Sequence, residues 1–391
     1  MASTEETSVV IIGGGTAGLA LATFLGNEGV ACVVLERRDR ATIQARQRAG
    51  AVDASSVRMF ERRGLADKLL AGPVTQTIDY RVNGVGRVFT VTSDDGSEGR
   101  FCTQQMLVAN LMRELIDNMG GDVRFAVSDV RISNEEGERP RVQYDRAGET
   151  HSLTCDFIAG CDADHGVSRA SIPADVLTTV SHEFGYAWLA SLVEAPAAGP
   201  AIMGTSDRGF VSQIPRGPER SRYYLQCPVS DGPEDWPDER IWDEIRLRLN
   251  DDTIKTAPVL TKEVVPLRSV IHYPMQYRNL FLAGDAAHLV PPTGGKGMNM
   301  ALYDVDVLAD ALTNAVKGAN TSGIECYSDT VMPRVWRYQE FSAWLTDTMH
   351  DGGDPAQHGA FRQMTARARL DELFTSPAAA RLHSDYLRGL A

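Results

Sequence analysis

The stretch "SVVIIGGGTAGLALATFLGNEGVACVVLE", residues 8–36, decides the fold. A short β-branched apolar run is followed by a helical pattern that ends in glycine and then by a second buried strand. Gly13, Gly15 and Gly18 form G-x-G-x-x-G between strand and helix, where the backbone can turn tightly and present helix N-terminal amides to a pyrophosphate. Glu36 ends the second strand, where its carboxylate can accept hydrogen bonds from a ribose diol. The stretch predicts a βαβ dinucleotide-binding unit; the alternative is three ordinary loop glycines and a strand-end glutamate.

Composition limits the classes of protein to consider. The chain has 391 residues, which is enough for two domains, and its 43% apolar and 23% charged residues are typical of a soluble globular protein. A net charge of -13 argues against general nucleic-acid binding. Neither a signal peptide nor a membrane-spanning segment is predicted, so we expect a cytoplasmic enzyme. The pattern predicts no metal site, and without C-x-x-C spacing the cysteines are predicted to be reduced core residues: Cys32, Cys102, Cys155, Cys161, Cys227 and Cys326.

The rest of the chain predicts a two-part α/β protein. Helices are expected over 53–70 and from the N-cap Thr103 to Gly120. Between about 181 and 267 the composition shifts to Tyr, Trp, Arg and Pro, and the pattern favours an antiparallel sheet. We therefore expect a Rossmann-like domain with an inserted antiparallel-sheet substrate domain and C-terminal helices. The expected bounds are 1–75, 98–180 and 268–350 for the dinucleotide domain, 76–97 and 181–267 for the substrate domain, and 351–391 for the C-terminal helical segment.

A second glycine-rich loop indicates which dinucleotide binds. In "FLAGDAAHLVPPTGGKGMNMAL", residues 281–302, a strand ends before Asp285, which could bond a ribityl hydroxyl. Three glycines (294, 295 and 297) then lead into a helix whose positive end suits a flavin's N1 and O2 locus. The pattern is not expected in a nicotinamide dehydrogenase and favours FAD.

Seven strings together resemble the para-hydroxybenzoate hydroxylase family of FAD-dependent aromatic monooxygenases, in order and spacing and over nearly the whole chain. They are "RAG" (48–50), "FIAGCDADHGVSR" (157–169), "RGF" (208–210), "RSRYYLQCP" (220–228), "VVPLRS" (264–269), "LFLAGDAAHLVPPTGGKGMNMA" (280–301) and "YLRGL" (386–390). In that family a glycine follows the acid of the second flavin motif, whereas here Ala163 follows Asp162. A turn with a capping aspartate is the alternative for this motif.

The resemblance implies roles for individual residues. Arg48 is expected at the FAD pyrophosphate and Gln104 and Asp285 at the ribityl chain, with Asp162 in the second flavin motif. Pro292, Thr293, Lys296, Gly297 and Asn299 are expected beside the isoalloxazine and the substrate. A nicotinamide coenzyme is expected on scattered basic residues, or else these are a basic surface: Arg37, Arg38, Arg46, His165, Arg169 and Arg268. The arginine-rich "ERRDRA" after residue 35 suits a 2'-phosphate and favours NADPH, with NADH possible.

The substrate positions are partly kept and partly changed. Arg216 takes the family's place for a bidentate arginine on the substrate carboxylate, and Tyr224 and Arg222 accompany it, with a solvated strand face as the alternative. Ile214 replaces a serine that bonds the carboxylate, and Met203 replaces the tyrosine that polarises the 4-hydroxyl. Gln76 falls where the family's proton wire ends in histidine, and the wire's second tyrosine matches Tyr386. The resemblance assigns the catalytic positions to Tyr386, Pro292, Arg216 and Tyr224.

The predicted activity is NADPH-consuming insertion of one oxygen of O2 into an electron-rich aromatic ring through a flavin C4a-hydroperoxide. Because Met203 and Ile214 cannot polarise a phenol, the expected substrate is an aromatic acid or larger arene other than plain 4-hydroxybenzoate. Authentic 4-hydroxybenzoate 3-monooxygenase, a flavin reductase or dehydrogenase, and a non-enzymatic flavin-binding protein stay open as alternatives. A small aromatic substrate and a homodimer are the expected partners, without nucleic acid or membrane.

Overall fold

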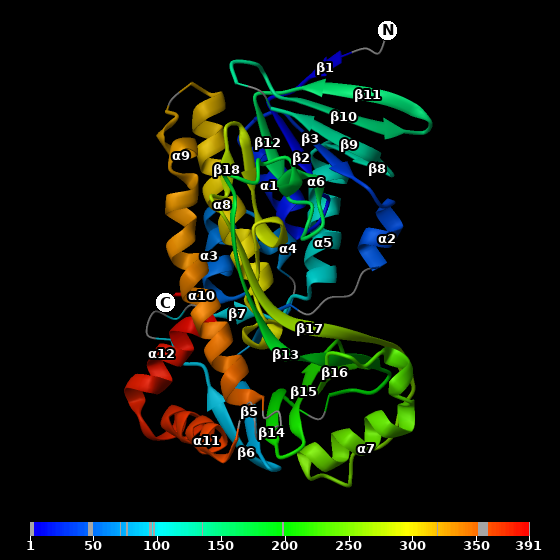
Figure 1. The fold of residues 1–391 in the computed structure, drawn as a ribbon, viewed down its shortest axis with the longest axis vertical. Helices are drawn as coiled ribbons and strands as arrows, with labels where there is room; N and C mark the ends of the chain where they lie inside the picture. The colour runs from blue at the N-terminus through cyan, green and yellow to red at the C-terminus, as the bar shows by residue number, and fades with distance from the viewer. Residues whose placement is uncertain are drawn as a thin grey trace.

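The structure is a computed structural model that describes residues 4–45, 50–70, 72–75, 77–93, 96, 98–134, 136–197, 199–318, 320–350 and 359–390. Figure 1 shows a sheet with flanking helices at one end of the molecule and a second large sheet at the other. The helix α10 (Tyr327–Met349) runs along both parts. The dinucleotide unit and the substrate sheet predicted from the sequence are therefore stacked end to end.

The first part is built on a six-stranded sheet in the order β18-β19-β12-β2-β3-β8. The five strands from β19 to β8 are parallel, and β18 is antiparallel to β19. All four residues of β2 are buried, as is usual for parallel strands covered on both faces. The bounds are β2 Val9–Ile12, β3 Cys32–Glu36, β8 Asp122–Phe125, β12 Phe157–Gly160, β18 Gln276–Tyr277 and β19 Leu280–Leu282. The predicted α/β class with a Rossmann-like unit is confirmed.

Helices and a smaller sheet surround this core. The helix α1 (Thr16–Asn27) is buried over its first ten residues and packs against α8 (Gly297–Val316) and α5 (Gln104–Met112). A four-stranded sheet in the order β1-β11-β10-β9 covers one end (Figure 1). Its bounds, with those of the smaller elements, are β1 Thr4–Glu6, β9 Ser128–Ser133, β10 Arg141–Arg146, β11 Glu149–Thr154, α2 Arg40–Ala45, α6 Val167–Ala170, β4 Val74–Thr75 and β7 Gly99–Arg100.

Two helix predictions can be compared with the structure here. The single helix expected over 53–70 is wrong, because α3 (Ala54–Arg62) and α4 (Ala66–Leu69) are separate and Gly64 between them has a φ of +66°. The helix expected from Thr103 is present, and the Thr103 side chain accepts a hydrogen bond from the Met106 amide. Its last turns form a π-helix, η1 (Arg113–Asn118), before the chain turns at a glycine.

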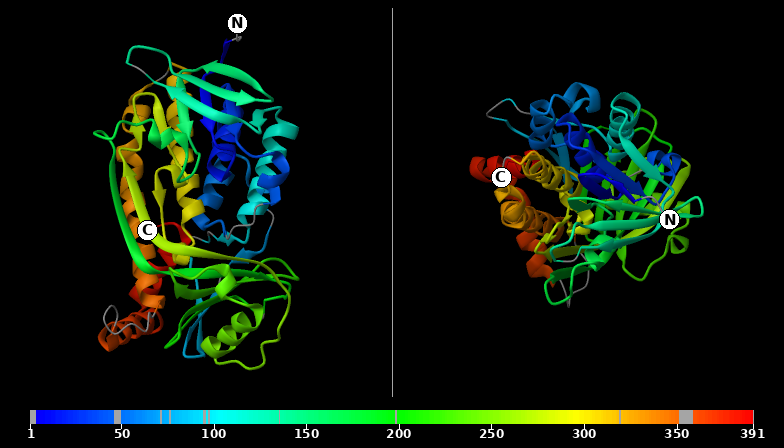
Figure 2. Two further views of the ribbon diagram at one scale, coloured as in Figure 1. Left: turned by 45° about the vertical axis from the view of Figure 1, so that its right-hand side comes forward. Right: turned by 90° about the horizontal axis from the view of Figure 1, so that it is seen from above.

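The second part is an eight-stranded sheet in the order β20-β17-β13-β16-β15-β14-β5-β6. Side chains along its inner strands point alternately to a face that meets the first part and to a face that packs on α7 (Asp238–Leu249). Figure 2 shows α7 beneath the sheet. The remaining bounds are β5 Thr77–Val82, β6 Val85–Thr90, β13 Thr178–Val193, β14 Ala201–Ser206, β15 Gly209–Pro215, β16 Ser221–Pro228, β17 Val259–Tyr273 and β20 His288–Leu289. The antiparallel sheet expected between 181 and 267 is thus present, and the sequence reasoning missed α7.

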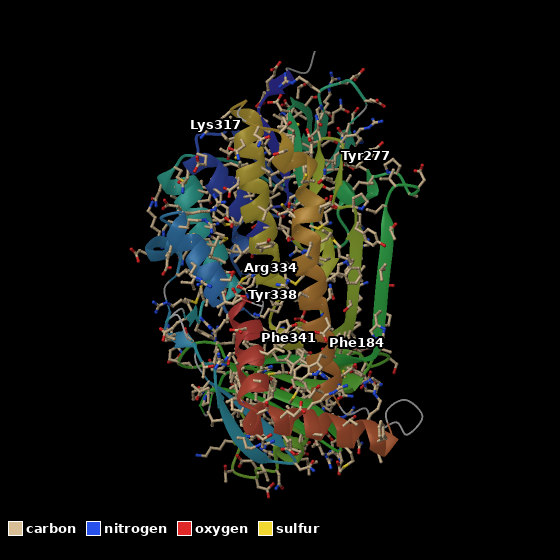
Figure 3. All side chains as sticks on the ribbon, turned by 90° about the vertical axis from the view of Figure 1, so that its left-hand side faces the viewer. Phe184, Tyr277, Lys317, Arg334, Tyr338 and Phe341 are labelled. Carbon is tan, nitrogen blue, oxygen red and sulfur yellow. The ribbon has the colours of Figure 1, made fainter. Side chains whose placement is uncertain are left out.

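The last helices, α9 (Ser322–Glu325), α10, α11 (Gly359–Thr375) and α12 (Pro377–Arg388), run back to the junction of the two parts. Figure 3 shows Arg334, Tyr338 and Phe341 following one another down α10 toward α12. The Arg334 guanidinium bonds the Gly389 carbonyl at 2.9 Å, which ties the end of α12 to α10.

Two further expectations bear on the class of protein. The prediction that all six cysteines are core residues is wrong for Cys326, which is exposed, while Cys32 is half-buried and the other four are buried. Within the described ranges, no helix combines the length and apolar character needed to cross a membrane.

Candidate functional site

The glycine loop at the start of α1 is shaped by close backbone contacts. Gly13 has a φ of +106°, and a Cβ there would lie 2.3 Å from the Cys161 carbonyl oxygen. At Gly18 a Cβ would lie 1.9 Å from the Gly13 carbonyl oxygen, so neither position tolerates a side chain. The Glu36 carboxylate accepts hydrogen bonds from the Gly14 and Arg38 amides, both at 2.7 Å. A turn of this kind leaves the amides at the start of α1 open toward an anion.

A cavity of about 1960 Å³ begins at this loop and extends to the large sheet. That volume exceeds what one drug-sized ligand needs, roughly 300–1000 Å³, and suits a dinucleotide together with a second molecule. It collects most of the residues predicted for the site, namely Gly13, Gly15, Glu36, Arg37, Arg38, Gln104, Asp162, His165, Met203, Ile214, Arg216, Arg222, Tyr224, Arg268, Asp285, Pro292, Thr293, Lys296, Gly297 and Asn299.

Three predicted positions that the structure describes do not line the cavity, and three others lie outside the described residues. Gly18 supports the loop from behind, and Arg169 and Tyr386 are not among the lining residues. The predictions for Arg46, Arg48 and Gln76 fall outside the residues that the structure describes.

The second predicted flavin loop places a half-buried carboxylate, Asp162, at the cavity. Asp162 Oδ2 accepts a hydrogen bond from the Ser168 amide at 2.9 Å, while its buried Oδ1 has no hydrogen-bond partner among the described residues. Burial raises the pKa of Asp162, and the hydrogen bonds from Ser168 oppose that rise. A buried oxygen without a donor fits a ligand hydroxyl such as those of FAD. Ala163 follows with a φ of +64°, the left-handed conformation that glycine adopts without strain.

The third loop brings a lysine and an amide to the cavity floor. Lys296 is buried, and its ammonium contacts Asp53 Oδ2 at 3.2 Å and the Leu387 carbonyl at 2.9 Å. Asn299 accepts a bond from the Asp53 amide and donates to the Ala51 carbonyl. Burial lowers the pKa of Lys296, and the Asp53 carboxylate opposes this. The loop is therefore fixed by its own chain, and the lysine's contacts are already made within the protein.

The inner face of the large sheet forms the other wall. Strand pairing aligns Met203 with Ser212, Ser212 with Tyr224, and Tyr224 with Ala190, and the next residue in this row is Glu263. All five line the cavity, because paired residues point to the same face of a sheet. We call them the central row.

One row along, Ile214 pairs with Arg222, and both again line the cavity. Strand pairing thus puts Met203, Ile214, Arg222 and Tyr224 on one wall. Period two predicted the shared face of Arg222 and Tyr224, whereas Met203 and Ile214 were implied by the family resemblance.

The two arginines of this wall have different surroundings. Arg222 forms an ion pair with Glu263. Arg216 is half-buried, donates to the Pro215 carbonyl at 2.9 Å, and lies 3.4 Å from the Tyr224 hydroxyl. Within the described residues it has no carboxylate partner. Burial lowers the pKa of Arg216. The contact with the Tyr224 hydroxyl opposes this decrease, whereas the positive charge of the nearby Arg222 lowers the pKa further. Arg216 is thus the cation of this wall that is left for an anionic ligand.

An aromatic group that sequence reasoning missed closes the wall beside the central row. Trp188 and Phe210 line the cavity and stack at 5.2 Å. The Trp188 indole donates to His350 Nε2 at 2.6 Å, and His350 Nδ1 contacts the Thr346 carbonyl at 2.8 Å. A carbonyl partner requires Nδ1 to carry the proton, which leaves Nε2 free to accept from the indole. This part of the cavity offers flat apolar surfaces that suit an aromatic ring.

Where the family's proton wire would run, the structure has other contacts. Tyr386 stacks on Phe341 at 4.7 Å between ring centroids. Tyr80 is the strand partner of Met203, and its buried hydroxyl contacts His383 Nε2 at 2.8 Å. Burial lowers the pKa of His383 to about 4, so it is neutral near pH 7. The Met203 thioether therefore lines the cavity, whereas Tyr80 and His383 are not among its lining residues.

Three of the residues predicted for the nicotinamide coenzyme gather around one carboxylate. Asp164 is bonded by Arg268 at 2.5 Å and by Arg169 at 3.2 Å, and the exposed His165 ring lies 3.7 Å away. Asp164, Arg268 and His165 line the cavity, as do Arg37 and Arg38. The cluster around Asp164 carries two guanidinium groups and one carboxylate, so part of its positive charge is already neutralised.

Comparison with known proteins agrees with this geometry. The sequence model of the FAD binding domain family matches residues 6–342. The chain is 36% identical over 354 residues to p-hydroxybenzoate hydroxylase from Acinetobacter baylyi, covering 89% of this chain and 87% of that protein. It is 26% identical over 388 residues to a probable NADH-specific resorcinol 4-hydroxylase from Rhodococcus jostii, covering 95% and 71%. The fold superimposes on p-nitrophenol 4-monooxygenase from Pseudomonas putida with a TM-score of 0.83 and 20% identity, over 99% of this chain and 100% of that one.

Proposed function

The chain belongs to the FAD-dependent aromatic hydroxylases, the family that includes p-hydroxybenzoate hydroxylase, and from that premise we propose that it hydroxylates an aromatic monoacid other than plain 4-hydroxybenzoate. The observation that carries the proposal is the pairing of an available guanidinium, Arg216, with an apolar Met203 on the same wall. Arg216 supports an anionic group on the substrate, and Met203 stands where the family has the tyrosine that would polarise a phenol.

The cofactor is FAD, and the residues around the cavity fit it. The amides at the start of α1 and the Glu36 carboxylate are placed for the adenosine diphosphate half, and Asp162 offers its unpartnered oxygen. Gln104 and Asp285 are proposed for the ribityl chain, and the loop that ends at Asn299 for the isoalloxazine ring. When bound, FAD accepts a hydride from a reduced nicotinamide and, with O2, supplies the electrophilic oxygen.

The chain's own contribution is to orient the ring and exclude water. We assign Arg216 and the Tyr224 hydroxyl to the substrate carboxylate, because a guanidinium can hold both carboxylate oxygens. Trp188 and Phe210 then contact the ring faces or edges, and Pro292 lies on the cofactor side of the same cavity. No described side chain of the central row other than Tyr224 carries a phenol, so the ring must be activated by its own substituents, such as an amino or alkoxy group.

For the coenzyme we propose NADPH. Arg37 and Arg38 follow the carboxylate that ends β3 and line the cavity, where guanidinium groups suit a 2'-phosphate. The relative from Rhodococcus jostii is named as NADH-specific, so NADH is the competing assignment. The ratio of kcat/KM for the two coenzymes decides between them, and a ratio in favour of NADH would refute this part of the proposal.

The test is steady-state coenzyme oxidation with a panel of para-substituted benzoic acids, with products identified by mass spectrometry under labelled O2. We expect labelled oxygen in the product and tighter coupling for an amino- or alkoxybenzoate than for 4-hydroxybenzoate. Fast, coupled conversion of 4-hydroxybenzoate to 3,4-dihydroxybenzoate would instead identify an authentic 4-hydroxybenzoate 3-monooxygenase, the function that the 36% identical relative favours. Coenzyme oxidation without labelled product would indicate a reductase.

A further inference from the structure

Two arginines flank one tyrosine on the substrate wall. The Tyr224 hydroxyl lies 3.4 Å from Arg216 Nη2, and the Arg222 guanidinium carbon lies 5.5 Å from the centroid of the Tyr224 ring. All three line the cavity. A ligand held against this tyrosine is therefore close to two positive charges at once.

A glutamate at the end of the central row changes this balance. Glu263 follows Ala190 in that row and pairs with Arg222, whose side chain is only 8% exposed, whereas the glutamate side chain is 60% exposed. The pair thus consists of a buried guanidinium and a carboxylate at the open side of the cavity. Among the described residues, the hydrogen-bond contacts of the Arg216 side chain are the Pro215 carbonyl and the Tyr224 hydroxyl. The wall therefore presents one neutral ion pair and one available cation.

We propose that Glu263 determines the charge of the substrate, because by occupying Arg222 it leaves a single anion site and so selects an aromatic ring with one anionic group. This inference rests on the proposed function. A second carboxylate on the ring would meet either the Glu263 carboxylate, which repels it, or a guanidinium that is already paired. A monoanion meets neither obstacle, since Arg216 alone can hold it.

The test uses the FAD-loaded protein and two probe ligands that need not react, benzoate and isophthalate, titrated by the change in flavin absorbance. For the natural chain we expect benzoate to bind more tightly than isophthalate. Glu263→Gln removes both the repelling carboxylate and the ion-pair partner of Arg222, so isophthalate should bind about tenfold more tightly while benzoate changes less than about twofold. Adding Arg222→Gln to that variant should abolish the gain.

Glu194→Gln is the matched control, because Glu194 is exposed at the end of β13, does not line the cavity, and changes the net charge by the same amount. It should leave both affinities unchanged. If benzoate binds but Glu263→Gln leaves the ratio of the two affinities as it was, the selective role of Glu263 is refuted while the acid-binding function stands. If benzoate does not bind to the natural chain at all, both the inference and the proposed acid substrate are refuted.

Discussion

Replacement of Arg216 by methionine tests whether its guanidinium binds the substrate. The side chain is half-buried, and its contacts are the Pro215 carbonyl at 2.9 Å and the Tyr224 hydroxyl at 3.4 Å, the second of which is long for a hydrogen bond. Neither contact neutralises the charge. The guanidinium therefore keeps donors available for an aromatic acid, and Arg216→Met removes them without removing the aliphatic stem that packs on the wall.

The magnitude follows from the kind of bond that is lost. A hydrogen bond to a charged group contributes about 1.5–3 kcal/mol, so losing the carboxylate contact should weaken benzoate binding by roughly 2–3 kcal/mol, or about 30- to 150-fold in Kd. Arg216→Lys keeps the charge but not the paired donors, and an intermediate loss is expected. The stability of the free protein should not fall, because the variant no longer half-buries a guanidinium that has no carboxylate partner among the described residues.

Flavin absorbance titrations with benzoate and urea unfolding of the same samples measure both effects. Arg220→Met is the control, since Arg220 is exposed four residues further on and does not line the cavity. A Kd for Arg216→Met that matches the natural chain would refute the assignment of the anion site. A loss of more than about 2 kcal/mol in unfolding free energy would show instead that Arg216 holds the wall together.

Three further changes have expected outcomes. Ala163→Gly should raise the free energy of unfolding by about 0.5–1 kcal/mol, because the strain of an alanine at φ +64° exceeds the entropy that glycine adds to the unfolded chain. Ala147→Gly, at φ +53° in the turn after β10, should give a similar gain. Equal urea midpoints for the natural chain and both variants would contradict this prediction. Asp164→Asn should lower the KM for the reduced coenzyme about threefold, because the carboxylate competes with the coenzyme phosphates for Arg169 and Arg268. An unchanged or higher KM would argue against this competition. Lowering the pH from 7 to 5 should lower the free energy of unfolding by about 2 kcal/mol through His383. Its pKa of about 4 in the folded protein lies below the usual 6.5, so the unfolded chain takes up the proton first. His383→Gln, which can still bond Tyr80, should lose that part of the pH dependence in urea unfolding, and an undiminished pH dependence would point to other groups.

Local sequence pattern predicted the parts of the site that local physics determines. The positions of Gly13 and Gly18 follow from contacts that exclude any side chain, and the run that ends at Glu36 is buried as its composition requires. Period two predicted that Arg222 and Tyr224 share a strand face, whereas Ile214 was assigned to the pocket by the family resemblance. The buried strand and the shared strand face depend on neighbours a few positions away. The close contact of Gly13 with the Cys161 carbonyl belongs to the tertiary fold, and that glycine was predicted from its place in the G-x-G-x-x-G motif.

The pairings within the site could not be predicted in this way. Arg222 meets Glu263 41 residues later, Trp188 meets His350 162 residues later, and Tyr80 meets His383 303 residues later. Each pair joins segments that only the tertiary fold brings together, and no spacing or composition signals it. The sequence therefore identified Arg222 as a cavity residue but not that its charge is already balanced.

These distant pairings change how the substrate wall should be understood. The central row carries polar groups at Ser212, Tyr224 and Glu263 and an apolar group at Met203, all on one face of a sheet whose opposite face packs on α7. Because alternate residues point to opposite faces, a residue of this row can change without disturbing the packing behind the sheet. Under the proposed function, Met203 and Glu263 set the polarity and the charge of the pocket in this way, and Arg216 is the proposed anion site. The proposal therefore assigns substrate choice to individual positions of the central row, which single substitutions can test one at a time.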